Sequence, residues 1–214
     1  MNKVLAIDSC SNNCSVSLLI DSEVVSRFES GVKSSSYLLP MCESLLKESC
    51  LKLTQLEGVV YTKGPGSFTG VRMGVACVQG LALAANLPTL GISSLEVMGY
   101  GATKKFKKQK IAIGLDARMG EVYWALYDNK ISKELLLKPN DAPELSNDFI
   151  GVGSAWLEYE ELSKITKIDN FFDYSPNAND LLSLVREKYS DKFSLDLGII
   201  QPTYLRNKVA EVKK

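Results

Sequence analysis

The sequence predicts a mixed α/β fold built from two similar halves. Two apolar runs, residues 4–8 and 111–116, are typical of buried strands, and each ends in an aspartate, Asp8 or Asp116. Each run is followed by a polar turn and by two further strand-like runs, so each half begins with a three-stranded meander. The two aspartates lie 108 residues apart, about half of the 214-residue chain. This repeat indicates a duplicated unit.

Helices and strands alternate after the first meander. The helix that follows it is expected to have Ser36 as its N-cap, which puts Pro40 in the first turn, where its missing N–H costs little. A glycine-rich turn opens a second, apolar helix, and Ser93 precedes a third. The expected strands are residues 4–8, 14–20, 23–28, 57–62 and 88–92, and the expected helices begin near residues 36, 71 and 93.

The second half repeats this order. Strands are expected at residues 111–116, 121–127, 130–137 and 149–152, and helices at residues 154–162 and 179–188. A meander followed by alternating helices and strands is the arrangement of a ribonuclease-H-like unit. The predicted fold class is therefore α/β with two ribonuclease-H-like lobes. The N-terminal lobe is predicted to comprise residues 1–103 and the C-terminal lobe residues 104–214.

The composition argues against several classes of function. Basic and acidic residues both number 25, so the formal net charge is zero and no overall field draws the chain to nucleic acid or to a membrane. We expect no apolar stretch long enough to span a bilayer. The first apolar run, residues 4–7, is too short for a secretory signal. The expected location is the cytoplasm.

The chain contains no histidine. Ser-His-Asp and Cys-His nucleophiles and all histidine-ligated metal sites are therefore excluded. The five cysteines are an odd number and form no Cys-x-x-Cys pair, so we expect reduced, mostly buried thiols. No catalytic residue, no metal site and no cofactor of the chain's own is predicted.

The glycine-rich turn before the apolar helix allows two interpretations. Free N–H groups at the start of a helix often bind phosphate. A P-loop, however, needs Lys and then Ser or Thr after its last glycine, whereas Val71 and Arg72 follow here, and Pro65 removes one donor. We favour a structural or contact turn over a nucleotide loop. Its candidate residues are Gly64, Gly66, Ser67, Thr69 and Gly70, with Asp8 beside them.

Asp8 and Asp116 also allow two interpretations. Carboxylates at such strand ends bind metal in nucleases and in actin-like ATPases. The nucleases need three or four converging carboxylates, and no such set can be assembled from this sequence. The ATPases place a glycine close after the aspartate, whereas Ser9 and Ala117 begin polar turns without one. We therefore expect both aspartates to cap turns.

The apolar helix at residues 71–85 is expected to be covered on more than one side, because it is apolar almost all round. It is either a fully buried core helix or part of a subunit interface. We expect some contact with another protein, formed by this helix and the one that begins near Ser36. The predicted partner-interface residues are Leu38, Leu39, Cys42, Leu45, Val71, Val75 and Val78.

A run of five lysines around Phe106, residues 104–110, lies between the halves. A solvated linker is the favoured interpretation. The alternative is a contact to a phosphate backbone, with Phe106 stacked on a base.

Six segments together resemble the TsaB (YeaZ) family. They are residues 5–9, 38–40, 64–76, 91–96, 115–123 and 202–206, in the order of the family and spanning nearly the whole chain. The segment Gly-Pro-Gly-Ser-Phe-Thr-Gly-x-Arg at residues 64–72 is the most specific. Residues 139–200 carry little of the resemblance.

The resemblance implies an actin-like (ASKHA) fold and a non-catalytic subunit of the bacterial complex that adds threonylcarbamoyl to N6 of adenosine 37 in tRNAs reading ANN codons. It implies pairing with, and activation of, a TsaD-type catalytic paralogue, recruitment of a TsaE-type ATPase, and a homodimer when alone. tRNA would be reached through the complex, and ATP and metal are expected on the partner subunits. The rival hypothesis is an active actin-like enzyme that hydrolyses nucleotide.

Overall fold

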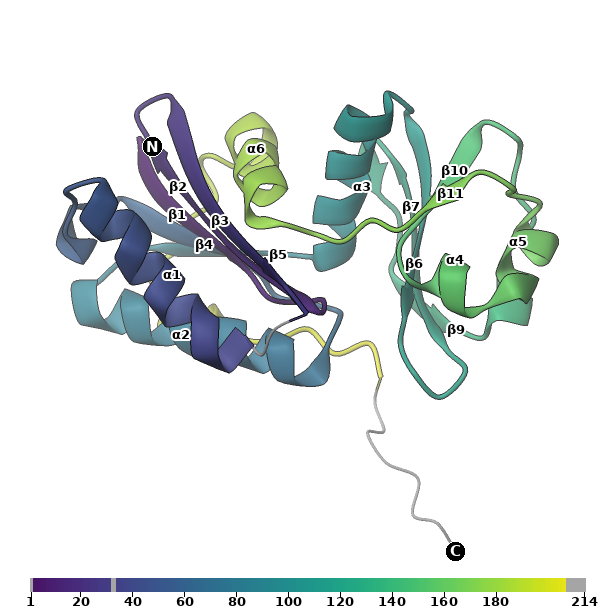
Figure 1. Ribbon diagram of the computed structural model, residues 1–214, viewed down its shortest axis with the longest axis horizontal. Coiled ribbons are helices and arrows are strands. Elements are labelled where there is room, and N and C mark those ends of the chain that lie inside the picture. The colour runs from purple at the N-terminus through teal and green to yellow at the C-terminus, as the bar shows by residue number, and fades with distance from the viewer. Residues whose placement is uncertain (1, 32–33, 207–214) are drawn as a thin grey trace, which may run out of the picture.

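Two mixed β-sheets with the same strand order form the frame of the molecule (Figure 1). The computed structural model describes residues 2–31 and 34–206. The first sheet has the order β3-β2-β1-β4-β5; β2 is antiparallel to β1 and β3, and β4 and β5 run parallel to β1. Its strands are β1 (Lys3–Asp8), β2 (Asn13–Ile20), β3 (Glu23–Ser30), β4 (Gly58–Thr62) and β5 (Thr89–Ile92).

The second sheet repeats this topology in the order β11-β10-β6-β7-β8, with β9 also paired to β7. Its strands are β6 (Lys110–Asp116), β7 (Val122–Asp128), β8 (Lys130–Ile131), β9 (Leu135–Leu137), β10 (Phe149–Val152) and β11 (Phe171–Phe172). Strand β7 is antiparallel to β6, and β10 and β11 run parallel to it. The predicted duplication is confirmed.

The prediction of a single strand at residues 130–137 is wrong, because the segment forms two separate strands, β8 and β9. Between them, the Ser132 hydroxyl rather than a carbonyl accepts the hydrogen bond from the Leu126 N–H (2.9 Å).

Helices alternate with the sheets to give five layers (Figure 1). Helices α1 (Ser34–Glu48) and α2 (Phe68–Ala85) cover the outer face of the first sheet. Helices α3 (Ser94–Phe106) and α6 (Ala178–Lys188) lie between the two sheets, and α4 (Ala155–Glu158) and α5 (Glu160–Thr166) cover the outer face of the second. Short 3-10 helices lie at Leu53–Gln55, Pro139–Asp141 and Leu197–Ile199.

The buried core follows these layers. Successive side chains of a strand point to opposite faces of the sheet. In β1, Leu5 and Ile7 therefore pack toward α1 and α2, whereas Val4 and Ala6 pack into the central core with α3 and α6. A third core lies between the second sheet and α4 and α5, around Trp156.

Two helix starts differ from the sequence prediction. Helix α1 begins at Ser34, not after Ser36, so Pro40 lies in its second turn. Pro40 is exposed, so water can solvate the carbonyl that it leaves without a partner. Helix α2 begins at Phe68 because Ser67 is its N-cap, with its hydroxyl accepting from the Gly70 N–H (3.4 Å).

The predicted lobe boundary between residues 103 and 104 is not where the chain divides. It falls inside the last turn of α3. Helix α6 packs on β1, β2 and β4 of the first sheet, and Ile200 is buried in the core beneath α1 and α2. Residues 178–200 therefore return to the first lobe, because the apolar face of α6 completes the central core.

Helix α2 corrects the expectation that no apolar stretch could span a bilayer. By length and composition alone it could, with 18 residues at a mean hydropathy of 1.4. Its inner side is packed in the core through Val75, Val78 and Ala82. Only 39% of the window is buried. Part of the outer side of α2 is exposed among the described residues, although Gln79 Nε2 on this side donates to the Ile200 carbonyl (2.8 Å).

Candidate functional site

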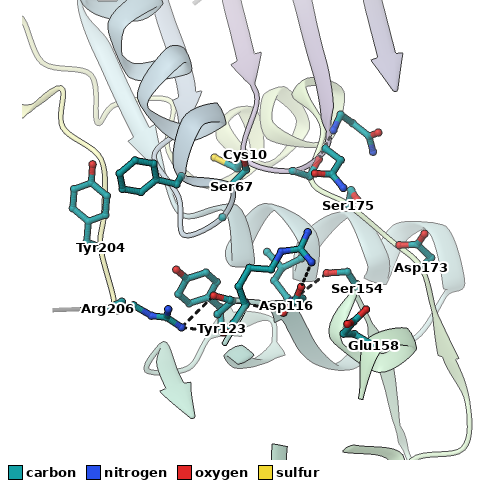
Figure 2. A pocket seen from close by; sticks show the side chains of 18 residues that line it. Cys10, Ser67, Asp116, Tyr123, Ser154, Glu158, Asp173, Ser175, Tyr204 and Arg206 are labelled. Atoms are coloured by element: carbon teal, nitrogen blue, oxygen red, sulfur yellow. Dashed lines mark hydrogen bonds and ion pairs between the residues drawn. The ribbon is translucent and has the colours of Figure 1, made fainter. Parts of the chain in front are cut away.

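A cavity of about 630 Å³ opens between the two lobes, beside the ends of β1 and β6 (Figure 2). One wall comes from the β1–β2 turn, residues 10–13, and from the glycine turn at residues 66–68. The other comes from the β6–β7 turn, residues 115–118, from the start of α4, and from the C-terminal segment that carries Tyr204 and Arg206. The duplication brings the two equivalent strand ends to this one place.

Asp8 is not part of the cavity wall. Its carboxyl group is fully buried, and Oδ1 accepts hydrogen bonds from the Thr62 hydroxyl (2.5 Å) and the Cys10 backbone N–H (3.4 Å). Oδ2 has no hydrogen-bond partner within the described residues. Burial raises the pKa of the Asp8 carboxyl from 3.8 to about 7, against the lowering effect of the Thr62 hydrogen bond. Asp8 thus caps its turn, as the sequence predicted.

This carboxyl group should make the stability of the fold depend on pH. Between pH 4 and 7 the unfolded chain ionises Asp8 while the folded chain keeps the proton, so the free energy of unfolding falls as the pH rises through this range. From pH 5 to 8 we expect a loss of about 3 kcal/mol relative to Asp8→Asn, measured by urea denaturation. Parallel pH curves for the two proteins would show that Asp8 is ionised throughout.

Asp116 is part of the cavity wall, but its charge is already paired. Oδ1 accepts from the Arg118 backbone N–H and the Tyr159 hydroxyl, both at 2.8 Å. Oδ2 lies 3.0 Å from Arg118 Nη1. Burial, together with the hydrogen bond to Asp116, raises the pKa of Tyr159 to about 12. The predicted turn cap is confirmed, and because Asp116 also pairs with Arg118 it has little free capacity to bind a metal ion.

The glycine turn is packed against the β1–β2 turn. The Ser67 N–H donates to the Cys10 carbonyl (2.7 Å), and the Ser9 hydroxyl donates to the Gly70 carbonyl (2.8 Å). A Cβ atom on Gly66 or Gly70 would lie 2.0 Å from the Cys10 or Ser9 carbonyl oxygen. These glycines are therefore required for close approach of two backbone segments.

The other predicted residues of the turn have separate places. Gly64 has a φ of +93°, and Thr69 is exposed in the first turn of α2. The contacts support the contact-turn interpretation over a phosphate cradle.

Cys10 lines the cavity without being an activated nucleophile. Its thiol is buried and donates to the Thr62 hydroxyl (3.1 Å). Burial and the neighbouring Asp8 carboxyl raise the pKa of the thiol far above its usual value. A thiol is nucleophilic only as the thiolate, so Cys10 has a packing role.

The remaining polar wall of the cavity is acidic. Glu158 and Asp173 are exposed on it, whereas its two arginines, Arg118 and Arg206, are paired with Asp116 and Glu121. No lysine lines the cavity within the described residues. A polyphosphate would therefore meet uncompensated negative charge. Sequence reasoning missed Glu158 and Asp173, because they lie in a stretch without a recognisable motif.

The C-terminal segment ties the two lobes together across the cavity. In the first lobe the Thr203 N–H donates to the Lys63 carbonyl (2.7 Å). In the second lobe Arg206 Nη2 donates to the carbonyls of residues 117 and 118 (3.1 Å each) and pairs with Glu121. Arg206 therefore binds a turn of the second lobe, a contact that the sequence alone did not reveal.

Six of the seven predicted interface residues lie inside the chain and cannot contact a partner directly. None of them is more than 5% exposed: Leu38, Cys42, Leu45, Val71, Val75 and Val78. Leu39, at 57%, is exposed on α1. Helical spacing identifies an apolar face but not what covers it, and here the first sheet covers it. The choice of these six residues was wrong.

The exposed side of α2 instead presents Phe68, Arg72, Ala76, Gln79 and Leu83, which we call the α2 outer stripe. These residues are three or four positions apart and lie on one side of the helix. Phe68 is 54% and Leu83 72% exposed. Arg72 is the only charged residue in α2.

The lysine run is not a linker. Lys104 and Lys105 belong to the last turn of α3, Lys104 pairs with Glu187, and Lys110 begins β6. Phe106 is stacked on Phe172 with ring centroids 4.2 Å apart. Because this ring is used in packing, it is not free to stack on a base.

In residues 2–31 and 34–206, no group of three or more Cys, Asp or Glu side chains is arranged to hold a metal ion. The duplicated sheets, the central helix pair and the interlobe cavity define a two-lobed protein of the actin-like class. Within that class, its glycine turn is occupied by packing and its cavity wall is acidic.

Comparisons with known proteins identify the family. A family profile described as TsaD, tRNA N6-adenosine threonylcarbamoyltransferase, matches residues 29–147. The chain is 36% identical over 222 residues to the tRNA threonylcarbamoyladenosine biosynthesis protein TsaB of Escherichia coli K12, covering 97% of this chain and 96% of that protein. TsaB of Haemophilus influenzae is 33% identical, covering 96% and 94%.

A solved structure gives the same result. YeaZ from Pseudomonas aeruginosa matches with a TM-score of 0.88 at 30% identity, covering 96% of this chain and 100% of that one. A second structure from that organism, equally similar, is described as a protein with similarity to peptidase YeaZ. The chain belongs to the TsaB (YeaZ) family, and the resemblance seen in the sequence is confirmed.

Proposed function

We propose that this protein is a non-catalytic subunit in the synthesis of N6-threonylcarbamoyladenosine at position 37 of tRNAs that read ANN codons. Its relatives are named as proteins of tRNA threonylcarbamoyladenosine biosynthesis, and this supports the same pathway for this chain. The observation that carries the accessory role is α2. One side of this helix is packed in the core, and the other presents the α2 outer stripe, with a single charge, to the surroundings. Such a surface is suited to docking on another protein.

The partner that fits this surface is a TsaD-type catalytic subunit, which the pairing activates. The TsaD family profile matches residues 29–147, and this range includes both α1 and α2. A paralogue with two equivalent helices can present a matching face, so that the four helices pack together about an approximate two-fold axis. In the absence of the partner, a second copy of this chain would take its place and give a homodimer.

The rest of the assembly supplies the chemistry. A TsaE-type ATPase joins the pair, ATP and metal are held by the partner subunits, and this chain has no cofactor of its own. tRNA is reached through the complex. The reaction takes place in the cytoplasm.

Two enzymatic alternatives have less support. An actin-like nucleotide hydrolase would bind its nucleotide in the interlobe cavity, where Glu158 and Asp173 oppose phosphate and the Ser67 N–H is bonded to Cys10. A histidine-dependent peptidase is excluded because the chain has no histidine.

Two measurements test the proposal. Isothermal titration of the isolated chain with Mg-ATP should give no binding heat. Reconstitution with purified TsaD-type and TsaE-type subunits of the same organism, threonylcarbamoyl adenylate and unmodified tRNA should give the modified nucleoside only when this chain is added. Tight ATP binding with turnover by the chain alone would establish the hydrolase instead. Full modification without the chain would refute an accessory role.

A further inference from the structure

Arg72 of α2 carries a positive charge for which the described residues supply no counter-ion or hydrogen-bond acceptor. It lies in the second turn of α2, and it is the only charged residue of that helix. No ion pair or hydrogen bond joins its guanidinium group to any other residue in 2–31 or 34–206, and its Nη1 atom is buried without a partner there. A buried N–H donor without an acceptor costs free energy.

Two aromatic rings hold this side chain in place. The guanidinium carbon lies 3.2 Å from the centroid of the Phe68 ring and 5.2 Å from that of Tyr204. Phe68 is 54% and Tyr204 47% exposed, so the cluster is at the surface. Stacking leaves the N–H groups other than those of the buried Nη1 along the edge of the guanidinium group, where a carboxylate can accept hydrogen bonds from them.

The cluster is continuous with the proposed docking surface. Phe68 and Arg72 are the first two residues of the α2 outer stripe, and Ala76, Gln79 and Leu83 continue it without a charge. A protein that covers the stripe must therefore also cover Arg72 and meet its charge.

We propose that Arg72, held between Phe68 and Tyr204, is the docking point for an Asp or Glu side chain of the TsaD-type partner. This inference rests on the proposed function, because it requires that partner. Because Nη1 is buried, the partner's carboxylate would accept from the N–H groups of the guanidinium that face the surface. An arginine flanked by aromatic rings in an apolar surface is typical of residues that dominate protein–protein affinity.

A phosphate of the tRNA is the less favoured ligand. A protein surface that binds a nucleic-acid backbone usually carries several Lys or Arg side chains, which together neutralise several phosphates. Here the other residues of the α2 outer stripe carry no charge, and the nearby Arg206 is already paired with Glu121.

The test measures the affinity of the full-length chain for its purified TsaD-type partner by isothermal titration calorimetry. Arg72→Gln should raise the Kd at least ten-fold, because the partner's carboxylate loses its cation. Arg72→Lys should have an intermediate effect, since it keeps the charge but not the planar fork. Arg186→Gln is the matched control, because Arg186 is an exposed arginine of α6, on the other face of the first sheet. Its Kd should be unchanged.

Thermal melts show whether each variant folds. If Arg72→Gln does not fold, the affinity of Arg72→Lys for the partner is the measurement that tests the inference. A folded Arg72→Gln that binds within two-fold of the natural protein overturns the inference but leaves the proposed pairing intact. Unchanged pairing with weaker tRNA binding by the assembled complex assigns Arg72 to a phosphate and also overturns it. If the natural protein does not bind the partner, the proposed function and this inference both fail.

Discussion

Gly70→Ala should lower the melting temperature of this protein by about 6 to 12 °C. The added Cβ would lie 2.0 Å from the Ser9 carbonyl oxygen, a contact with backbone that no side-chain rotation can relieve. Either α2 or the β1–β2 turn must move, and overpacking of this kind costs about 3 kcal/mol. In a domain of this length each kcal/mol corresponds to about 2 to 4 °C. The measurement is a thermal melt followed by circular dichroism.

The same helix offers two matched controls. A methyl group added at Gly80 would meet no other part of the described chain within 4 Å, so Gly80→Ala should stabilise the helix by about 0.5 to 1 kcal/mol. At Gly74 the methyl group would meet the Ser9 hydroxyl at 2.5 Å, and this side chain can rotate away at the cost of its hydrogen bond to Gly70. The expected order of melting temperatures, from highest to lowest, is Gly80→Ala, then Gly74→Ala, then Gly70→Ala. A Gly70→Ala protein as stable as the natural one would contradict the close approach of the two turns.

The fold was predictable because its repeat is visible in short local patterns. Each half begins with an apolar strand that ends in aspartate, and these strands became the equivalent strands β1 and β6. What sequence could not show was the return of the chain to the first lobe. The apolar face of α6 is compatible with either sheet, and only the packing of Leu181, Leu184 and Val185 in the central core decides between them.

The candidate site was predictable only in part, for a related physical reason. Turn capping by Asp8 and Asp116 is a local property, so it could be predicted correctly from neighbouring residues. The acidic wall depends on Glu158 and Asp173, which meet the cavity only through tertiary packing. The prediction of the interface residues failed because the burial of a helix face depends on what packs opposite it. In the same apolar helix, Val75 lies in the core whereas Leu83 is exposed.

Leu83→Asp should abolish pairing with the TsaD-type partner while leaving the isolated chain folded. Leu83 is 72% exposed in this chain, so a charge there costs the monomer little. In the proposed complex the same carboxylate would be buried against the partner without a counter-ion, at a cost of about 3 to 5 kcal/mol. That cost weakens binding by about two to four orders of magnitude. Calorimetry with the partner measures the loss, and sedimentation of the isolated chain tests whether the homodimer uses the same face.

Leu157→Asp is the matched control for this prediction. Leu157 is a leucine of similar exposure, 60%, on α4, which covers the outer face of the second sheet (Figure 1). It should leave pairing unchanged. Charges at Val75 or Leu45 are not suitable, because both residues are buried in the core and their variants would unfold the chain. If a folded Leu83→Asp protein pairs normally whereas Leu157→Asp does not, the docking surface lies on the second lobe and not on the outer side of α2.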